Sequence, residues 1–132
     1  KHHISPEELT MILQLKYKAK KSRGLSKLPP QLLKFLGDKG IQSLAAFLNA
    51  SAIDQTPPTS WRTAKVPLYK GKGDATDPEN YRSIAIPAPF AKVFMATMNA
   101  RLTTSANTLN LHAPTQAGFR AHHTTTEQAL IL

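Results

Sequence analysis

Cysteine is absent from the 132-residue sequence, and aromatic residues are scarce. Without cysteine the chain can form neither a disulfide framework nor a thiolate zinc site, and an intracellular compartment is favoured. Aromatic residues make up only 7% of the chain, so no platform for stacked bases is evident. No apolar run approaches the roughly 20 residues that span a bilayer, so we expect no membrane partner.

Acidic residues are also few, and their shortage leaves a large positive charge. Eight Asp and Glu stand against 17 Lys and Arg, which gives a formal charge of +9 and an isoelectric point near 10.1. A domain with this excess usually binds a polyanion, and nucleic acid is the first candidate. The alternative is a basic surface that serves solubility alone.

The length of the chain allows one domain with a single core. Because the first residue is Lys1 rather than Met, either an organellar presequence was removed or the sequence is a fragment of a longer protein. The mitochondrion is therefore one expected location, beside the nucleus and the cytoplasm. The adjacent His122 and His123 point to different sides of a helix or strand, so we expect no metal site and no cofactor.

Apolar residues recur at helical spacing in four places. Ser5 can cap a first helix that runs to about Lys21, and Pro29 opens a short second helix. Asp38 can cap a third, and the fourth follows a proline-broken strand. The residues expected to face inward are, in chain order, Leu9, Ile12, Leu13, Tyr17, Leu32, Leu33, Phe35, Leu36, Ile41, Leu44, Ala45, Leu48, Phe90, Val93, Phe94, Thr97, Met98 and Leu102.

The last thirty residues predict a loop and the start of one more helix. Ser105 to Thr115 is polar and contains two Asn and one Pro, which is typical of a loop. Thr124 to Glu127 has a capping-box pattern and begins a helix that stops on an apolar run at Leu132. This abrupt stop suggests that a larger domain would continue the chain.

The end of the first helix and the loop after it carry six cations in twelve positions. Cations at a helix C-terminus are favoured by the helix dipole, so part of this cluster has a structural reason. Six exceed that need, and we predict that some of them contact RNA phosphates. The six are Lys16, Lys18, Lys20, Lys21, Arg23 and Lys27.

The stretch from Trp61 to Ile86 predicts two strands joined by a loop. Residues 63–69 and 83–86 alternate in the period-two pattern of a half-buried strand. Between them, residues 70–73 read Lys-Gly-Lys-Gly, with two cations and two residues free to take positive φ, which suits phosphate. The spacing differs from that of a nucleotide-hydrolysing P-loop. The acidic residues Asp74, Asp77 and Glu79 are predicted to be turn residues rather than catalysts.

Five segments, in order, carry a resemblance to a known family. Residues 21–34 keep Lys, Gly, Pro, Leu-Leu and Lys of a "KAPGPDGIPAELLK" signature, and LGDKGIQSLAAFLNA follows as the next helix. Residues 61–86 are similar to "W..A.I.PIYKKGD...NYRPISL", residues 92–102 to "K.......RL", and QAGFR with TTTEQ to "Q.GFR....T..Q". Together they resemble the N-terminal fingers, with the start of the palm, of a non-LTR (LINE-type) retrotransposon reverse transcriptase.

The resemblance implies roles for individual residues. The triphosphate of an incoming nucleotide would meet Lys70 or Lys72 together with Arg82, since Arg offers phosphate a planar fork and Lys a mobile charge. For Tyr81 the alternative is a ring packed under the loop. For Phe119 the alternative is core packing. The residues that the resemblance places near the template and nucleotide are Gln116, Phe119 and Arg120.

Departures from the family pattern bear on activity. Where the family has the Asp of "PDGIP", this sequence has Ser26 and Lys27. Where Pro follows "NYR" in the family, this sequence has Ser83. The polymerase carboxylates, a strand-borne Asp and the YADD turn, belong to later motifs that this sequence lacks. Two-metal phosphoryl transfer requires acidic ligands holding ions about 4 Å apart. We therefore predict no catalytic residue and no polymerase activity for this chain alone.

The expected fold class is α+β, a mostly helical fragment of a reverse-transcriptase fingers subdomain with a small antiparallel sheet. Residues 1–60 would form its N-terminal helical part with the basic cluster. Residues 61–132 would form the strand-loop-strand unit and the helices that lead into the palm, all within one domain.

Two functions from different classes follow. The first is a non-catalytic, reverse-transcriptase-derived RNA-binding module, a structural component of a large ribonucleoprotein such as a mitochondrial ribosome, in contact with ribosomal RNA and neighbouring proteins. The alternative is the fingers portion of an active RNA-directed DNA polymerase of a non-LTR retrotransposon, with its palm outside this chain. A protein-interaction scaffold without nucleic acid is a third possibility.

Overall fold

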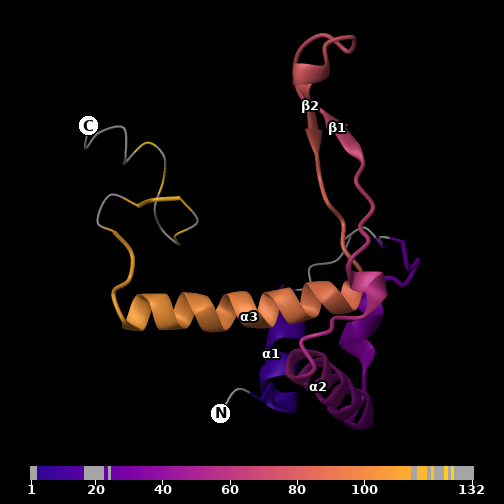
Figure 1. Ribbon diagram of the computed structural model, residues 1–132, viewed down its shortest axis with the longest axis vertical. Helices are drawn as coiled ribbons and strands as arrows, with labels where there is room; N and C mark the ends of the chain where they lie inside the picture. The colour runs from indigo at the N-terminus through magenta and orange to yellow at the C-terminus, as the bar shows by residue number, and fades with distance from the viewer. Residues whose placement is uncertain are drawn as a thin grey trace. The chain divides into compact units, whose positions relative to one another are not determined.

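Three α-helices, three 3-10 helices and a two-stranded antiparallel sheet form the part of the chain that the structure, a computed structural model, describes (Figure 1). The predicted α+β class, mostly helical with a small antiparallel sheet, is confirmed. The described residues are 3–16, 23, 25–113, 116–118, 120, 124 and 126. The elements are α1 (Pro6–Lys16), η1 (Pro30–Phe35), α2 (Asp38–Ile53), η2 (Thr59–Trp61), β1 (Leu68–Lys70), η3 (Pro78–Asn80), β2 (Tyr81–Ser83) and α3 (Pro89–Thr108).

The chain divides into two compact units, Lys1–Met98 and Asn99–Leu132. The first unit holds the hydrophobic core and the hairpin of β1 and β2, and α3 crosses the boundary between the units. The expected division near residue 60 within one domain stays a prediction.

Helix α1 begins as its sequence predicts. The backbone N–H of Glu8 donates to Ser5 Oγ at 3.2 Å, which satisfies one of the free amides of the first turn. The segment before the helix is fixed by Asn49 of α2, whose amide accepts from Ile4 N at 2.7 Å and donates to Ile4 O at 2.9 Å. The predicted continuation from Tyr17 to Lys21 lies outside the described residues.

The second helix is a 3-10 helix, and half of its predicted inward face is wrong. Leu33 is buried and Leu36 packs against the core, but Leu32 is half exposed and Phe35 is 82% exposed. A 3-10 helix repeats every three residues, so Pro30, Leu33 and Leu36 share one face and the other two apolar residues point elsewhere.

Helix α2 has the predicted buried face, because Ile41, Leu44, Ala45 and Leu48 are all buried. The predicted cap differs by one residue. Gly37 is the N-cap, without a side-chain hydrogen bond, and Asp38 is the first helical residue. An acidic residue in that first turn remains favourable, because its charge meets the positive end of the helix dipole.

Helix α3 is longer than its sequence pattern indicates. It begins at Pro89, which fits a first helical position, and it continues to Thr108 through four residues predicted to be loop. Val93 and Thr97 are buried as predicted, and the Thr97 hydroxyl donates to Val93 O. Leu102, predicted to face inward, is 69% exposed.

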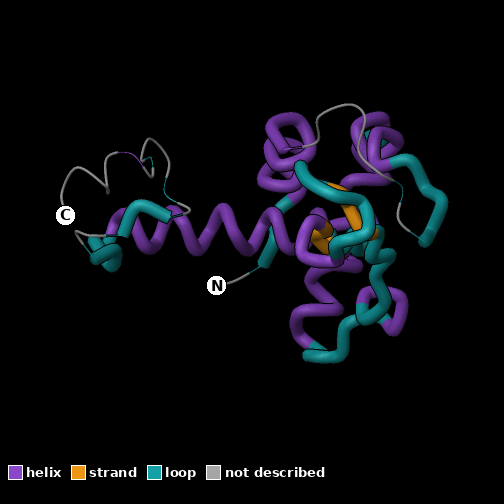
Figure 2. The backbone as a smooth tube through the Cα atoms, turned by 90° about the horizontal axis from the view of Figure 1, so that it is seen from above, coloured by secondary structure: helices purple, strands orange, loops and turns teal. Residues whose placement is uncertain are grey.

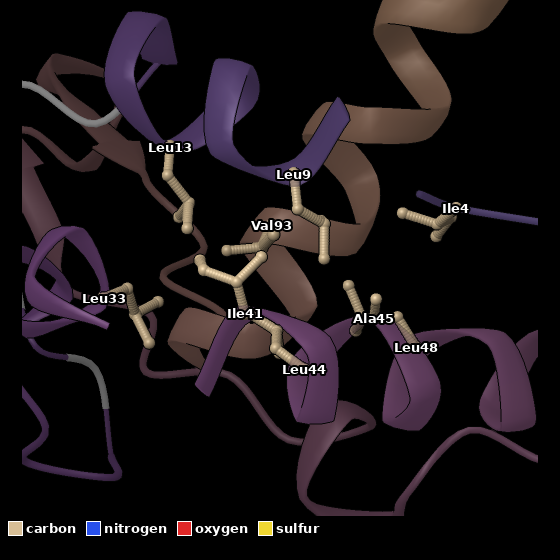
Figure 3. Packing of buried hydrophobic residues seen from close by; sticks show 9 residues of the cluster. All are labelled: Ile4, Leu9, Leu13, Leu33, Ile41, Leu44, Ala45, Leu48 and Val93. Atoms are coloured by element: carbon tan, nitrogen blue, oxygen red, sulfur yellow. The ribbon is translucent and has the colours of Figure 1, made fainter. Parts of the chain in front are cut away.

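The core lies where α1, η1, α2 and α3 converge (Figure 3). Its buried side chains are Ile4, Leu9, Leu13, Leu33, Ile41, Leu44, Ala45, Leu48 and Val93. Beside it, Trp61 lies 5.9 Å from Phe47 of α2 and 5.5 Å from Phe94 of α3, measured between ring centroids. These ring contacts anchor the chain just before it leaves the helices to form the hairpin.

Candidate nucleic-acid interface

The predicted strand-loop-strand unit is an antiparallel hairpin, whose strands Figure 2 colours orange. Its register pairs Leu68 with Ser83, Tyr69 with Arg82, and Lys70 with Tyr81. An isolated bridge between Lys65 and Ile86, with both backbone hydrogen bonds, continues the same register toward the helices. The pairing therefore extends beyond the three residues of each strand.

The hairpin is exposed rather than half-buried, which corrects the expectation from the alternating pattern. Val66 is 52%, Leu68 69% and Ile84 47% exposed. Alternation sorts side chains onto two faces of a strand, but burial of one face needs a second layer against it. Among the described residues no side chain of β1 is buried.

The loop between the strands is held by its own hydrogen bonds. Gly71 N donates to Asn80 O at 2.6 Å, and Asn80 Nδ2 donates to Asp74 O at 3.0 Å and to Asp77 Oδ2 at 3.2 Å. Gly73 takes a φ of +112°, so one of the two glycines that are free to take positive φ does so. Gly71 does not share that conformation, since Gly73 alone among the described glycines does.

The acidic residues of the loop act as turn caps, as predicted for Asp74 and Asp77. Asp74 Oδ1 accepts from Thr76 N at 2.9 Å, and Asp77 Oδ1 accepts from Glu79 N at 2.9 Å. The hydrogen bond from the Thr76 backbone amide, aided by the Thr76 side chain, lowers the pKa of Asp74. The Asp74 carboxylate therefore stays ionised to a lower pH than an ordinary aspartate does.

The charges of the hairpin tip balance. Residues 70–82 contain three cations and three acids, so their formal sum is zero. Lys70 Nζ donates to Gly73 O at 2.9 Å and thus helps to close the loop. A phosphate at the tip would meet local cations rather than a net positive field. The six residues are Lys70, Lys72, Arg82, Asp74, Asp77 and Glu79.

The register separates the predicted phosphate residues onto two faces. Successive side chains of a strand point to opposite sides, and cross-strand partners share a side. Arg82 therefore lies on one face with Tyr69, while Lys70 lies on the other with Tyr81. Lys72, in the loop, is exposed. The structure brings the three cations to one hairpin but not to one surface.

The first of these faces carries an aromatic ring and two cations. Tyr69 is 66% exposed, its partner Arg82 is exposed, and Lys65 lies four residues before it on the same side of the strand. We call Lys65, Tyr69 and Arg82 the Tyr69 face. Neither Tyr69 nor Lys65 stands out in the sequence as a binding residue. The register is centred between Ala75 and Thr76, so closing the hairpin about the Gly-rich loop at residues 70–73 would not have paired Tyr69 with Arg82.

The opposite face contains a shallow apolar depression. It has a volume of about 480 Å³ and lies beside Tyr81, whose hydroxyl donates to Ala75 O at 2.9 Å. This bond ties the ring beneath the loop, as the packing alternative for Tyr81 predicts. The lining residues are Leu68, Thr76, Pro78, Tyr81 and Ser83.

Part of the predicted basic cluster lies outside the described residues, namely Lys18, Lys20 and Lys21. Lys16 is the last residue of α1, and Arg23 and Lys27 are exposed in the segment before η1. Lys27 has a φ of +56°. Between Glu8 and Asp38 the sequence has seven of its 17 Lys and Arg and no acid, so this segment alone has a formal charge of +7.

The second unit holds the remaining predicted site residues. Arg120 Nη1 donates to Gln116 O at 3.1 Å, and Arg120 N donates to Ala117 O at 3.2 Å, so these residues form one local turn. The Gln116 side chain is exposed and Ala117 is buried. Phe119, His122 and His123 lie outside the described residues.

Among the residues that the structure describes, no three His, Asp or Glu side chains gather as metal ligands. No helix within those same residues has the length and apolar character needed to cross a bilayer. No protein-family model matches the chain, and no curated protein matches it. A functional proposal therefore rests on the quoted sequence segments and on the geometry of the hairpin and the basic cluster.

Proposed function

We propose that this chain is a non-catalytic RNA-binding module derived from a reverse transcriptase and that it serves as a structural component of a large ribonucleoprotein, such as a mitochondrial ribosome. The observation that carries the RNA-binding part is the Tyr69 face, an exposed ring flanked by two cations on an exposed hairpin. The net charge of +9 supports it.

The chemistry of the Tyr69 face matches single-stranded RNA. Unpaired bases stack on aromatic rings, and such stacking contributes roughly 1–3 kcal/mol per base. Arg82 lies directly across the hairpin from the ring and Lys65 further along the same face, so both can reach the phosphates on either side of a stacked base. A ring and two cations on one face favour a looped or single-stranded segment over a duplex.

The basic segment before η1 would add affinity without sequence preference. Each phosphate neutralised releases counterions, so log K falls with log salt by about 0.7 per contact for a single strand. The Tyr69 face supplies two cations and hence up to about 1.4 units of slope. The six clustered cations could supply more, so most of the salt dependence should remain when the hairpin is altered.

The test is a salt titration of the affinity for a fluorescent single-stranded RNA, with the full chain and three variants. Lys65→Ala with Arg82→Ala should weaken binding and flatten the slope by about 1.4 units. Tyr69→Ala should weaken binding roughly 5- to 100-fold and leave the slope unchanged, because a stacked ring carries no charge. Lys39→Ala, an exposed cation on α2, is the matched control.

Two results would contradict the proposal. A slope near zero for the unaltered chain would exclude phosphate binding altogether. Equal effects of Tyr69→Ala and Lys39→Ala would move the RNA away from the hairpin, most simply to the Lys16–Lys27 segment.

The fingers of an active polymerase remain the second candidate, because the Lys-Gly loop forms at the hairpin tip with Gly73 at positive φ and Lys72 exposed. A nucleotide triphosphate held there would compete with RNA. Lys70 and Arg82 lie on opposite faces, so a triphosphate would have to reach around the hairpin edge to meet both. Competition by a magnesium nucleotide, lost in Lys72→Ala, would favour this candidate. RNA binding unaffected by the nucleotide would favour the first.

A further inference from the structure

Two hydroxyl residues in this sequence have a Lys or Arg three positions before them. They are Ser26, after Arg23, and Thr104, after Arg101. Arginine at this position is what a large class of serine/threonine kinases selects, because an acidic subsite beside the active site binds the guanidinium. These kinases bind the substrate as an extended segment. Local structure therefore decides which of the two hydroxyls is a substrate.

Ser26 lies in an exposed turn that is accessible to a kinase. It is exposed in a turn between α1 and η1, and its Oγ donates to Arg23 O at 3.2 Å. Lys27 follows with a φ of +56°, and Pro29 then has extended backbone. One weak, exposed hydrogen bond holds the hydroxyl. None of the described residues 23 and 25–29 lies in a helix or is buried, so binding in a kinase cleft would unwind no helix and expose no core residue among them.

Thr104 has the same spacing but the opposite setting. It lies within α3, which runs from Pro89 to Thr108, and its Oγ1 donates to Ala100 O at 3.0 Å. To present Arg101 and Thr104 as an extended segment, the helix would have to unwind over more than a turn. Unwinding would break several backbone hydrogen bonds. Thr104 is therefore an internal control for the effect of local structure on phosphorylation.

We propose that Ser26 is a phosphorylation site for an arginine-directed serine kinase. Ser26 Oγ attacks the γ-phosphorus of ATP, an Oγ–P bond forms, and the bond to the β,γ-bridging oxygen breaks as ADP leaves with its electron pair. The hydroxyl proton passes to the catalytic carboxylate of the kinase. The product phosphate lies between the exposed cations Arg23 and Lys27, which can form charge-assisted hydrogen bonds to its oxygens.

The modification would alter the most basic segment of the chain. Seven cations and no acid lie between Glu8 and Asp38, and a phosphoserine adds about −1.5 to −2 charges there. If the proposed RNA function holds, phosphorylation should weaken RNA binding and reduce its salt slope. This consequence rests on the proposed function, whereas the modification itself does not.

The experiment treats the full chain with calcium/calmodulin-dependent protein kinase, an arginine-directed enzyme, and magnesium ATP, and locates phosphate by tandem mass spectrometry. We expect one phosphate, on Ser26. Ser26→Ala should incorporate at least ten-fold less phosphate than the unaltered chain. Arg23→Ala should lower the rate of phosphorylation at least ten-fold. Thr104→Ala should change neither the amount nor the rate. Both altered residues near the site are exposed, so the variants should fold.

Three outcomes would overturn the proposal: Thr104 modified as fast as Ser26, a rate at Ser26 independent of Arg23, or a peptide of residues 20–30 modified while the folded chain is not. The RNA measurement is made separately on the purified phosphoprotein. Phosphate on Ser26 without any RNA binding before or after would leave the site established and refute the proposed function.

Discussion

Replacing Gly73 by alanine tests whether the hairpin loop is a fixed structure. Gly73 has a φ of +112°, which L-residues with a side chain rarely adopt. A Cβ at this position would lie 2.6 Å from Asn80 Oδ1, well inside contact distance. The Asn80 amide is not free to move, because it donates to Asp74 O and Asp77 Oδ2. The added methyl must therefore disturb either the backbone or this network.

The cost can be estimated from these contacts. A strained φ costs about 1–3 kcal/mol, and the two hydrogen bonds of the Asn80 amide contribute about 0.5–1.5 kcal/mol each. The sum is roughly 2–6 kcal/mol. A two-stranded hairpin alone is marginally stable, so the loss should appear as local opening of the loop rather than as unfolding of the helical core.

Amide hydrogen exchange measured by NMR separates these outcomes. In Gly73→Ala the Gly71 amide, which donates to Asn80 O, should exchange at least about 30-fold faster, the equivalent of 2 kcal/mol. The amides of α2 should keep their rates. Gly37→Ala is the matched control, since Gly37 has a φ of −70° and no atom within 4 Å of an added Cβ. An unchanged Gly71 exchange rate in Gly73→Ala would refute the fixed loop.

Two further predictions concern the core and the loop carboxylates. Leu48 is 0% exposed, so Leu48→Ala should lower the free energy of unfolding by about 2–5 kcal/mol in urea denaturation, whereas Phe35→Ala, at an 82% exposed position, should change it by less than about 0.5 kcal/mol. Because the folded-state pKa of Asp74 lies below its ordinary value of 3.8, the loop gains stability from its carboxylate above that pH and loses it as the pH falls through the lowered pKa. The protection factor of the Thr76 amide, which corrects its exchange rate for the intrinsic pH dependence of amide exchange, should therefore fall in acid, and Asp74→Asn should remove that dependence. Loop protection that grows in acid would contradict this sign.

The sequence predicted the helices whose cause is local. Ser5 is followed by Glu8 at the capping distance, and the apolar residues of α2 repeat at helical spacing, so start and buried face follow from neighbouring residues alone. The pattern failed at η1, where the few apolar residues of a six-residue segment cannot distinguish a helix of three residues per turn from one of 3.6. It also ended α3 early, because polar residues such as Asn107 are compatible with an exposed helical turn.

At the candidate site, too, some features were predictable from the sequence and others required the structure. Residue types alone indicated a Lys-Gly loop between two strands and an excess of cations before η1. They did not indicate that Arg82 and Lys70 lie on opposite faces, since faces follow from the cross-strand register. The structure likewise separates Ser26 in an open turn from Thr104 in a helix, although both follow arginine at the same spacing.

By itself the sequence determined the charge, the mostly helical α+β class, the Ser5 cap and the hairpin, because each depends on composition or on residues a few positions apart. Only the tertiary structure decided that no described residue buries a side chain of β1 and that Tyr69 shares a face with Lys65 and Arg82. Those features depend on which segments, distant in sequence, come into contact in the folded chain. Pairing between residues that are far apart in sequence leaves no periodic signal from which it could be predicted.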